Sequence, residues 1–378
     1  MLKSRLCIAF FAFAVGCAPA QKPLTDYVNP MLGTATLWDS VDLGFKPTKR
    51  TWGAEVFPGS SLPNAMVQVS PVTKFHSGAG YQYEDSVIYG FTHTNKGHWN
   101  LCHIPLLPVT GTPTPGDYCS PFSHERESAA PGYYQVFLDR YGVDAQLSST
   151  LRCAFHKYTY PAGAAASLLA DLQRSNEHVR AWDIRKEGDN VFAGWQQTGE
   201  KMYFYAVANR PVTGIEPVVE GDREVRIVRF GEGDGALELR IGFSFVSEKN
   251  ARENLEAEML GKSFAEVRSE ATATWNDLLG RIRVEGGTER EKGLFYSSLY
   301  RSFLWPALRS DVNGEFTDVD GKVINPGFRY YTGPSYWDDY RNKLILLGML
   351  APDVAADVIS SDTDKGEKRG GFMPTFFH

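Results

Sequence analysis

Side chains able to bind a polar ligand gather in three short stretches of this 378-residue sequence. The stretches hold Trp52 and Gly53, then His98 and Trp99, then Trp337, Asp338 and Arg341. Indole rings offer flat apolar faces, carboxylates accept hydrogen bonds from hydroxyl groups, and guanidinium groups donate them. These are the candidate binding residues, and each of them also has an ordinary structural explanation.

The third stretch combines two adjacent acids with a tryptophan and an arginine. We expect Asp338 and Asp339 at the start of a helix, where the helix dipole favours negative charge, and this explanation suffices for Asp339. Arg341 either orients Asp338, binds a ligand hydroxyl or forms an ordinary surface or interdomain ion pair. Trp337 either stacks on a sugar ring or packs between two domains, and the sequence does not decide between these.

Three histidines, His93, His98 and His103, recur at intervals of five residues. Structural zinc sites use other spacings, so we expect these side chains to pack or to face a ligand rather than to bind a metal. Cys102 lies beside them. No base is assigned next to its thiol, so we do not expect a nucleophilic cysteine.

Composition argues against nucleic-acid binding, and length indicates the number of domains. The formal net charge is -6, from 39 Lys and Arg against 45 Asp and Glu. This balance argues against a nucleic-acid-binding protein, which neutralises phosphates with a basic surface. Aromatic residues make up 13% of the chain, which is common in sugar-binding proteins but is also explained by a large aromatic core. The length favours two domains over one.

The first 20 residues have the pattern of a signal peptide. A basic start precedes an apolar run at 7–15, which is too short to span a bilayer as a helix. Residues 14–17 resemble a lipobox that would leave Cys17 lipidated, whereas residues 18–20 resemble an ordinary A-x-A cleavage site. We favour the lipobox. Either site predicts export across the inner membrane, to the periplasm or to the outer membrane as a lipoprotein.

The sequence up to about residue 250 has the periodicity of strands. Residues 237–245 alternate apolar and other side chains, the pattern of a strand with one buried face, and several upstream runs do the same. Polar turn clusters separate these runs. We therefore predict an N-terminal β-sandwich domain over 24–250.

Beyond residue 250 the apolar residues recur at helical spacing. Two capping boxes mark helix starts, Ser263 with Glu266 and Thr288 with Glu291. A further helix is expected from about Trp337 to Leu350, and another after Pro352. The pattern predicts a helical linker over 251–287, followed by the first helices of a helical domain over 288–378.

The C-terminal end has the composition of an interior segment. Residues 371–378 are apolar and aromatic, whereas free termini are usually polar. The helices expected over 288–378 are also too few to close a large helical domain. We therefore expect a C-terminally incomplete chain, inactive and poorly stable alone. Its apolar helix faces around Phe295 and Leu347 would then lack partners.

Six stretches, taken in order, resemble glycoside hydrolase family 92. They are residues 50–60, 62–71, 80–83, 89–94, 152–161 and 336–341, the last containing Trp-Asp-Asp-Tyr-Arg at the head of an expected helix. The resemblance runs from about residue 27 to the end of the chain. Several matching blocks in order are far more specific than any one of them.

The resemblance implies a β-sandwich packed on an (α/α)6 barrel and calcium-assisted, inverting, exo-acting hydrolysis of α-linked mannose. It implies that the loop carrying Trp52 and Gly53 reaches the terminal mannose and that Asp338 binds sugar hydroxyls. In the family, a Glu acid, an Asp base and most calcium ligands come from the later barrel. We therefore expect all of these beyond His378. The implied partners are α-mannosyl glycans, with α-1,2 linkages favoured.

One segment departs from the family pattern. Many relatives carry a Ser-Gly-x-Gly type loop after the position of His93, whereas this chain has residues 95–103 with His98 and Trp99. The departure leaves linkage and aglycone preference open. Two other functions are weighed against the mannosidase. One is a non-catalytic carbohydrate-binding or vestigial protein, and the other is a phosphorylase or lyase that combines a sandwich with a helical barrel.

Overall fold

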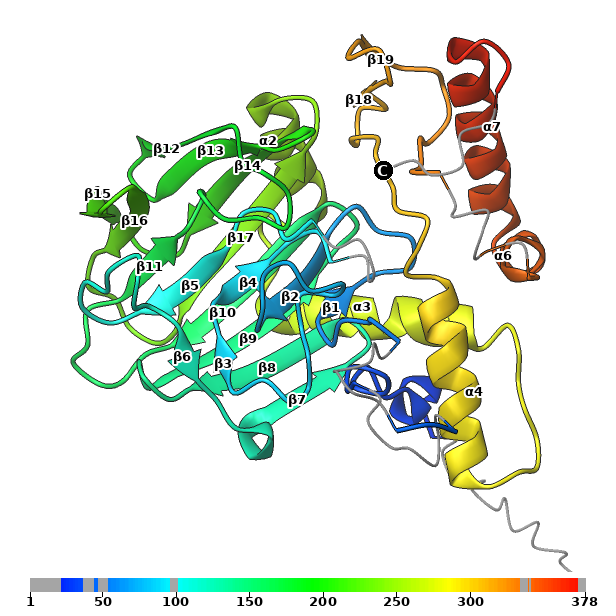
Figure 1. The fold of residues 1–378 in the computed structure, drawn as a ribbon, viewed down its shortest axis with the longest axis horizontal. Coiled ribbons are helices and arrows are strands. Elements are labelled where there is room, and N and C mark those ends of the chain that lie inside the picture. Colours follow the sequence, from blue (N-terminus) through cyan, green and yellow to red (C-terminus); the bar gives the residue numbers. More distant parts are fainter. Residues whose placement is uncertain are drawn as a thin grey trace, which may run out of the picture.

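The computed structural model describes residues 22–36, 44–46, 54–95, 101–333, 339 and 341–372. In this part of the chain, two large antiparallel sheets form the body at the left of Figure 1. One has seven strands in the order β1-β2-β4-β5-β11-β16-β15, and the other has eight in the order β12-β13-β14-β17-β10-β9-β8-β7.

The strands of the seven-stranded sheet are β1 (Ser60–Ser61), β2 (Gln68–Val72), β4 (Gly90–Thr92), β5 (Leu106–Val109), β11 (Ser167–Ala170), β16 (Arg223–Phe230) and β15 (Val212–Glu220). Those of the eight-stranded sheet are β12 (Ala181–Gly188), β13 (Val191–Gln197), β14 (Lys201–Ala208), β17 (Leu237–Ser244), β10 (Cys153–Thr159), β9 (Val143–Ser149), β8 (Tyr133–Leu138) and β7 (Glu127–Ala130). Smaller elements are the pair β3 (Val87–Ile88) and β6 (Ser120–Pro121), the pair β18 (Phe316–Thr317) and β19 (Val323–Ile324), and the 3-10 helices η1 (Leu24–Tyr27) and η2 (His124–Arg126).

Alternating apolar side chains fill the space between the two sheets. On β17 the inward-pointing residues from Leu237 to Phe243 are fully buried, as the alternation at 237–245 predicts. Phe91 of β4 stacks on Tyr158 of β10 across the interior, with ring centroids 6.2 Å apart. Apolar surface removed from water contributes about 25 cal/mol per Å², so this interior is the main source of stability.

Helix α2 (Glu248–Glu258) covers the outer face of the eight-stranded sheet, against β17 and β14. Leu255 of α2 joins Phe155 of β10 in a second, smaller apolar cluster. The helix approaches closely because β17 carries Gly242. A Cβ atom on Gly242 would lie 2.1 Å from the carbonyl oxygen of Ala251, so no larger residue fits without displacing the helix.

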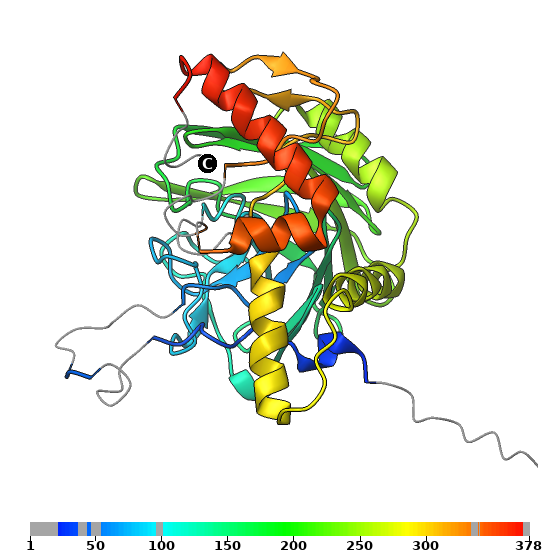
Figure 2. The same cartoon turned by 90° about the vertical axis from the view of Figure 1, so that its right-hand side faces the viewer.

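Helices α3 (Phe264–Leu279) and α4 (Glu289–Ser302) begin at the two predicted capping boxes, with Ser263 and Thr288 as N-caps. Trp275 of α3 is fully buried, and its indole N–H donates to the carbonyl oxygen of Ser61, 2.7 Å away. Figure 2 shows α4 and the two C-terminal helices on one side of the sandwich. The predicted order, a mainly β part followed by helices, is confirmed.

The two C-terminal helices are α6 (Lys343–Leu350) and α7 (Pro352–Lys368), which pack on each other. The helix predicted from about Trp337 to Leu350 lies partly outside the described residues, and Asp339 within it is helical. Asn342 adopts a left-handed conformation with φ of 77°, which interrupts a right-handed helix before Lys343. Pro352 opens α7 as predicted, because a helix's first turn does not need its missing N–H.

The sequence predicted exposed apolar helix faces around Phe295 and Leu347, and the structure agrees for the first of these residues only. Phe295 of α4 is 37% exposed, but Leu347 of α6 is buried, so the prediction for Leu347 is wrong. Leu347 belongs to the apolar cluster that includes Val358 of α7, and the exposed face of α6 carries Ile345 and Met349 instead. Across the ranges given above, none of the helices is long and apolar enough to cross a membrane.

Candidate functional site

Arg341 is the candidate binding residue that lies within the described residues. Its side chain is exposed and precedes α6. The other candidates lie outside the described residues: Trp52, Gly53, His98, Trp99, Trp337 and Asp338, together with the lipidation candidate Cys17. The segments on either side of them lie within the described residues.

Asp339 is buried, and the Nζ atom of Lys343, four residues later, lies 3.1 Å from its carboxylate. This contact is an ion pair, and the helix-dipole explanation of Asp339 stays a prediction.

The ends of two predicted binding stretches meet at one small cavity. Thr94 and Leu101 bracket residues 96–100, and Thr332 precedes residues 334–338. All three side chains line a cavity of about 20 Å³ together with Phe245 and Arg309. Segments far apart in the sequence therefore converge where the sandwich meets the helical part.

Backbone hydrogen bonds hold these ends in place. The amide of Leu101 donates to the carbonyl oxygen of Thr94, 3.2 Å away. The amide of Thr332 donates to the carbonyl oxygen of Ala307 at 2.8 Å, and the amide of Ala307 donates to the hydroxyl of Thr332 at 2.9 Å. Local hydrogen bonds therefore fix the described residues at both ends.

The end of the stretch that holds Trp52 and Gly53 is linked to Leu101 through a chain of contacts that starts at Glu55. This residue has a positive φ of 48°, and its carboxylate packs on Gly78, where a Cβ would lie 2.3 Å from the carboxyl carbon. The next link is Asn176, whose side chain donates to the carbonyl oxygen of Ser77 at 3.0 Å and whose amide donates to that of Leu101 at 3.0 Å. Three successive contacts therefore connect Glu55 with Leu101, at the end of the His98 stretch.

His93 is a packing residue inside the sandwich. Its Nε2 atom lies 3.0 Å from Nε2 of His156, whose Nδ1 atom lies 2.6 Å from the hydroxyl of Tyr158. Burial lowers the pKa of His93 to about 3 and lowers that of His156 well below its usual range, although backbone carbonyls oppose the shift at His93. Both rings are therefore neutral at neutral pH and hold the core of the sandwich together.

His103 connects the candidate site to the sheet. Its Nδ1 atom lies 3.0 Å from the hydroxyl of Thr94, and its Nε2 atom lies 3.0 Å from the hydroxyl of Thr198 in the β13–β14 turn. The neighbouring thiol of Cys102 is buried, and burial raises its pKa. A buried neutral thiol is a poor nucleophile, as expected from the sequence.

The described residues hold no cluster of the side chains that most often bind metal ions. Calcium takes about six to eight oxygen ligands, largely from carboxylates and carbonyls. Among the residues that the structure places, no group of three or more His, Cys, Asp or Glu side chains could hold a metal ion. No calcium ligand is assigned to them.

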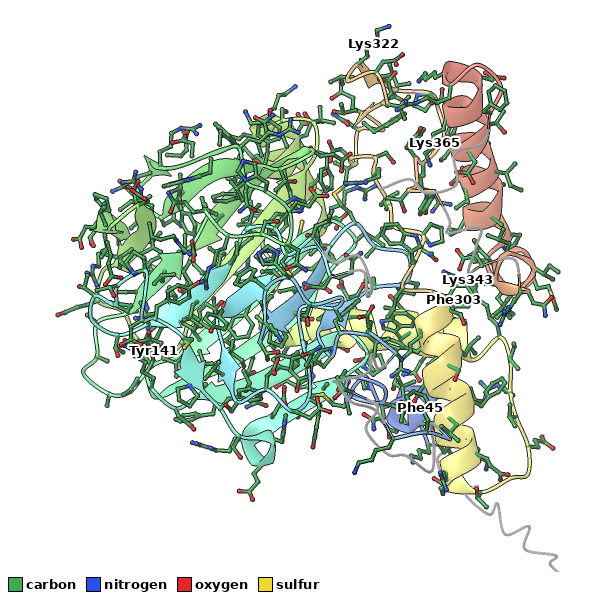
Figure 3. The ribbon with its side chains drawn as sticks, in the orientation of Figure 1. Phe45, Tyr141, Phe303, Lys322, Lys343 and Lys365 are labelled. Carbon is green, nitrogen blue, oxygen red and sulfur yellow. The ribbon has the colours of Figure 1, made fainter. Side chains whose placement is uncertain are left out.

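A larger cleft of about 600 Å³ adjoins the small cavity and shares Phe245, Arg309 and Thr332 with it. One wall comes from the sandwich, through Glu200, Lys201 and Tyr203 among others, and the other comes from residues 317–332 and α7. Figure 3 shows Lys365 on the side of α7 that faces the sandwich. The cleft therefore lies between the two parts of the chain.

Charged side chains in this cleft are held by specific partners. Arg309 donates to the carboxylate of Glu200, and its guanidinium lies 3.9 Å from the ring centroid of Phe245. The Nζ atom of Lys365 donates to the carbonyl oxygen of Tyr331 at 2.7 Å and to Asp362 at 3.2 Å. Burial lowers the pKa of Lys365, against the opposing effect of the Asp362 carboxylate.

Sequence reasoning did not find Glu200, Arg309 or Lys365. They belong to no recognisable motif, and they are more than fifty residues apart along the chain. The turn Thr198-Gly199-Glu200 between two alternating runs is the one local signal available, and it indicates a hairpin rather than a binding wall.

Two family models, both from the same family, match this chain. Residues 27–253 match the family model described as the glycosyl hydrolase family 92 N-terminal domain. Residues 250–378 match the model of the glycosyl hydrolase family 92 catalytic domain.

Similar solved structures point the same way. The chain is similar to a family GH92 α-mannosidase from Bacteroides thetaiotaomicron, with a TM-score of 0.85, 26% identity, and coverage of 94% of this chain and 51% of that one. A second protein of that organism, described as an inverting mannosidase, gives a TM-score of 0.81 at 26% identity, with coverage of 94% and 50%. A curated protein of Arthroderma benhamiae, named as an uncharacterized secreted glycosidase, is 24% identical over 76% of this chain and 42% of its own length. The chain thus spans about half of these relatives or less.

Proposed function

This chain belongs to glycosyl hydrolase family 92, and on that premise we propose that it is part of an exo-acting, inverting α-mannosidase. The observation that carries the proposal is the similarity over 94% of the chain to two mannosidases, at TM-scores of 0.85 and 0.81. The first of these was also solved in complex with mannoimidazole. We propose α-mannosyl glycans as substrates, with α-1,2-linked terminal mannose favoured.

The contribution of this chain is to position the sugar. The ends of two stretches line the cavity that includes Thr94, Leu101 and Thr332, and the end of the Trp52 stretch is linked to Leu101 through Ser77 and Asn176. We propose that the stretches present Trp52, His98, Trp99, Trp337, Asp338 and Arg341 to the terminal mannose from this region. An indole ring covers the apolar face of a pyranose, while a carboxylate and a guanidinium bind its hydroxyls.

Inverting hydrolysis needs two carboxyl groups about 6.5–9.5 Å apart, one to protonate the leaving oxygen and one to activate water on the opposite face. We propose that these are a Glu and an Asp beyond His378, and that the described helices are the first of an (α/α)6 barrel. We also propose that the whole enzyme depends on calcium, with ligands beyond His378. No step is assigned to the ion here.

The test begins with the coding sequence downstream of His378. A frame that continues with paired acids in helical segments supports the proposal, and the complete product should then release mannose from the non-reducing end of α-mannosides. Proton NMR of the first product should show the β-anomer, because inversion changes the configuration. Release of an internal oligosaccharide, or of the α-anomer, would contradict exo-acting inversion.

Binding of mannosides without release would favour a non-catalytic carbohydrate-binding protein. A requirement for phosphate, with mannose 1-phosphate as product, would point to a phosphorylase instead. Chelation followed by calcium readdition tests the metal separately, since activity should be lost and then restored. Unchanged activity after chelation would refute the dependence on calcium.

We also propose export directed by the signal peptide over residues 1–20, with lipidation of Cys17. The similar curated protein named as secreted supports export and says nothing of a lipid. In a bacterial host, palmitate labelling of the protein should disappear in Cys17→Ser. Equal labelling of both forms, or none in either, would refute the lipid anchor.

A further inference from the structure

Residues 303–308 follow α4 and form part of the wall of the small cavity described above. Trp305 and Ala307 line that cavity together with Thr332. Figure 3 shows Phe303 at the end of α4, where this segment begins. The segment belongs to no named helix or strand of the described chain, so its buried backbone groups need partners from elsewhere. A single residue of the sandwich supplies several of these partners.

That residue is Asn64, which binds the segment at three points. Its amide donates to the carbonyl oxygen of Phe303 at 2.6 Å, and its carbonyl oxygen accepts from the amide of Leu308 at 2.9 Å. Its side-chain nitrogen Nδ2 donates to the carbonyl oxygen of Pro306 at 2.8 Å. Asn64 is 3% exposed, so these hydrogen bonds are shielded from water. The course of the segment is therefore fixed from the sandwich side.

The sandwich in turn holds Asn64 in place. It lies in the turn between β1 and β2, where the amides of Met66 and Val67 donate to the carbonyl oxygen of Leu151 at 2.9 and 3.2 Å. Asn64 has a positive φ of 52°, a conformation that asparagine tolerates better than most residues and that glycine adopts freely. Glycine would satisfy this backbone equally well. What asparagine adds is the side-chain hydrogen bond to Pro306.

On its other side, the same segment holds the residues that precede the proposed sugar contacts. The Nε1 atom of Trp305 donates to the carbonyl oxygen of Gly333 at 3.2 Å. Ala307 and Thr332 exchange two hydrogen bonds, at 2.8 and 2.9 Å. Gly333 is the last described residue before residues 334–338, which include two of the side chains that we propose for sugar binding. A continuous chain of hydrogen bonds therefore runs from the β1–β2 turn to Gly333.

We infer that Asn64 is a positioning residue for the proposed mannose site. The inference rests on the proposed function and adds how that site is held. Asn64 fixes the segment 303–308, and this segment fixes Thr332 and Gly333. A displacement of about 1 Å among binding residues already weakens recognition, so such a support matters although Asn64 itself does not touch the sugar. The block 62–71, which the family resemblance singled out, gains a role through its asparagine.

Asn64→Asp tests the side-chain hydrogen bond in the complete protein. The substitution keeps the size of the side chain, but an ionised carboxylate cannot donate to the Pro306 carbonyl oxygen and is repelled by it. The affinity for methyl α-mannoside, measured by calorimetric titration at about pH 8, should fall about tenfold relative to the parent. At about pH 4.5 the introduced carboxyl group is protonated, because burial favours the neutral acid, and it donates again. The difference from the parent should then shrink to less than about threefold.

Two further variants control for folding and for the chemical change itself. Asn64→Gly keeps the positive φ and both backbone hydrogen bonds, so it should fold and lose about threefold in affinity, equally at both pH values. Asn190→Asp is the matched control and should bind like the parent. Asn190, in the β12–β13 turn, donates from Nδ2 to the carbonyl oxygen of Ala208 at 2.7 Å and accepts from its amide at 2.9 Å.

Three results would overturn the inference. The first is an unchanged affinity in Asn64→Asp at about pH 8, and the second is a loss in this variant that persists in full at about pH 4.5. The third is an equal loss in Asn190→Asp, which would mean that any such change in the sandwich weakens binding.

Hydrogen exchange separates this inference from the proposed function. A parent protein that binds no mannoside contradicts the proposed function, whereas equal binding by the parent and Asn64→Asp contradicts this inference alone. Exchange of the amides of Ala307 and Thr332 requires neither ligand nor turnover. At about pH 8 it should be about tenfold faster in Asn64→Asp than in the parent, and unchanged in Asn190→Asp. Equal exchange in all three proteins would refute the positioning role whatever the mannoside binding.

Discussion

The sandwich and the helical part of this chain are stabilised in different ways. Between the sheets, the inward residues of β17 from Leu237 to Phe243 are fully buried. On the C-terminal helices, Ile345, Met349 and Ile359 are 62%, 71% and 67% exposed. The sandwich therefore satisfies its apolar pattern with its own strands, whereas α6 and α7 bury only one face against the described residues.

Polar contacts join the two parts in addition to the apolar cluster that runs through both. Three consecutive residues after α4 each bond to the sandwich or to α2. Arg309 donates to Glu200, the carbonyl oxygen of Ser310 accepts from Nε of Arg152 at 2.8 Å, and Asp311 accepts from Ser244 at 2.6 Å. Polar contacts of this kind fix geometry more than they add stability, because their net contribution is about 0.5–1.5 kcal/mol each. We therefore expect substitutions between the sheets to lower the free energy of unfolding strongly. Substitutions on the exposed helix faces should change it little.

The largest loss of stability is expected from removing a large side chain between the two sheets. Phe243→Ala removes a fully buried ring on β17 and should lower the free energy of unfolding by about 3–5 kcal/mol. Urea unfolding followed by tryptophan fluorescence measures the change. A loss below about 1 kcal/mol would mean that the sheets do not depend on this interior, and the comparison would fail.

The next-largest effect is a pH dependence of the free energy of unfolding. It comes from Asp311, one of the residues that bond the helical part to the sandwich at their junction. Burial raises the pKa of Asp311 from 3.8 to about 6, although hydrogen bonds from Ser244 and Asn254 oppose the shift. The folded state therefore binds this proton more tightly than the unfolded state does. The stability that this group contributes is fully present below about pH 3.8 and is lost as the pH rises to about 6, an effect of about 3 kcal/mol.

Asp311→Asn removes this titration while keeping the size of the side chain. Relative to the parent, the variant should gain up to about 3 kcal/mol of stability between pH 4 and pH 7, measured by urea unfolding across that range. Asp117→Asn is the control of opposite sign, because hydrogen bonding from Arg140 lowers the pKa of exposed Asp117. Parallel pH profiles for the parent and Asp311→Asn would show that the junction does not hold a buried carboxylate.

A smaller effect tests how closely α2 lies on the sheet. Gly242→Ala places a methyl group 2.1 Å from the carbonyl oxygen of Ala251 and should cost about 1–3 kcal/mol by displacing the helix. Gly214→Ala on β15 is the matched control, since nothing lies within 4 Å of its added Cβ atom. Equal costs for the two substitutions would mean that the close approach of α2 is not what requires glycine at 242.

Much of the fold could be predicted because its signals are local. Alternation at 237–245 predicts one buried face of β17, and the capping boxes at Ser263 and Thr288 predict the starts of α3 and α4. The interruption before α6 could not be predicted, because the left-handed conformation of Asn342 has no neighbouring glycine or proline signal.

The cleft and the junction could not be predicted, because they depend on contacts between distant segments. Asp311 bonds to Ser244, 67 residues away, and Arg309 bonds to Glu200, 109 residues away. No periodicity or spacing encodes such pairs. The candidate residues drawn from the family resemblance, in contrast, fall mostly outside the described residues. For them the fold supplies only the converging ends at Glu55, Leu101 and Thr332.

The smallest effect is expected on the exposed face of α6. Met349→Gln replaces a 71% exposed apolar side chain with a polar one of similar length and helix propensity, so the free energy of unfolding should change by less than about 0.5 kcal/mol. Leu347→Gln, two residues earlier, buries an amide in an apolar cluster where the leucine is 3% exposed, and should cost more than about 2 kcal/mol. Both values refer to this 378-residue chain. In the complete protein, Met349→Gln should instead cost more than about 2 kcal/mol, because the proposed barrel covers this face, and an unchanged small cost there would contradict the barrel. With the barrel in place, the helical part would share the apolar stabilisation of the sandwich instead of contrasting with it.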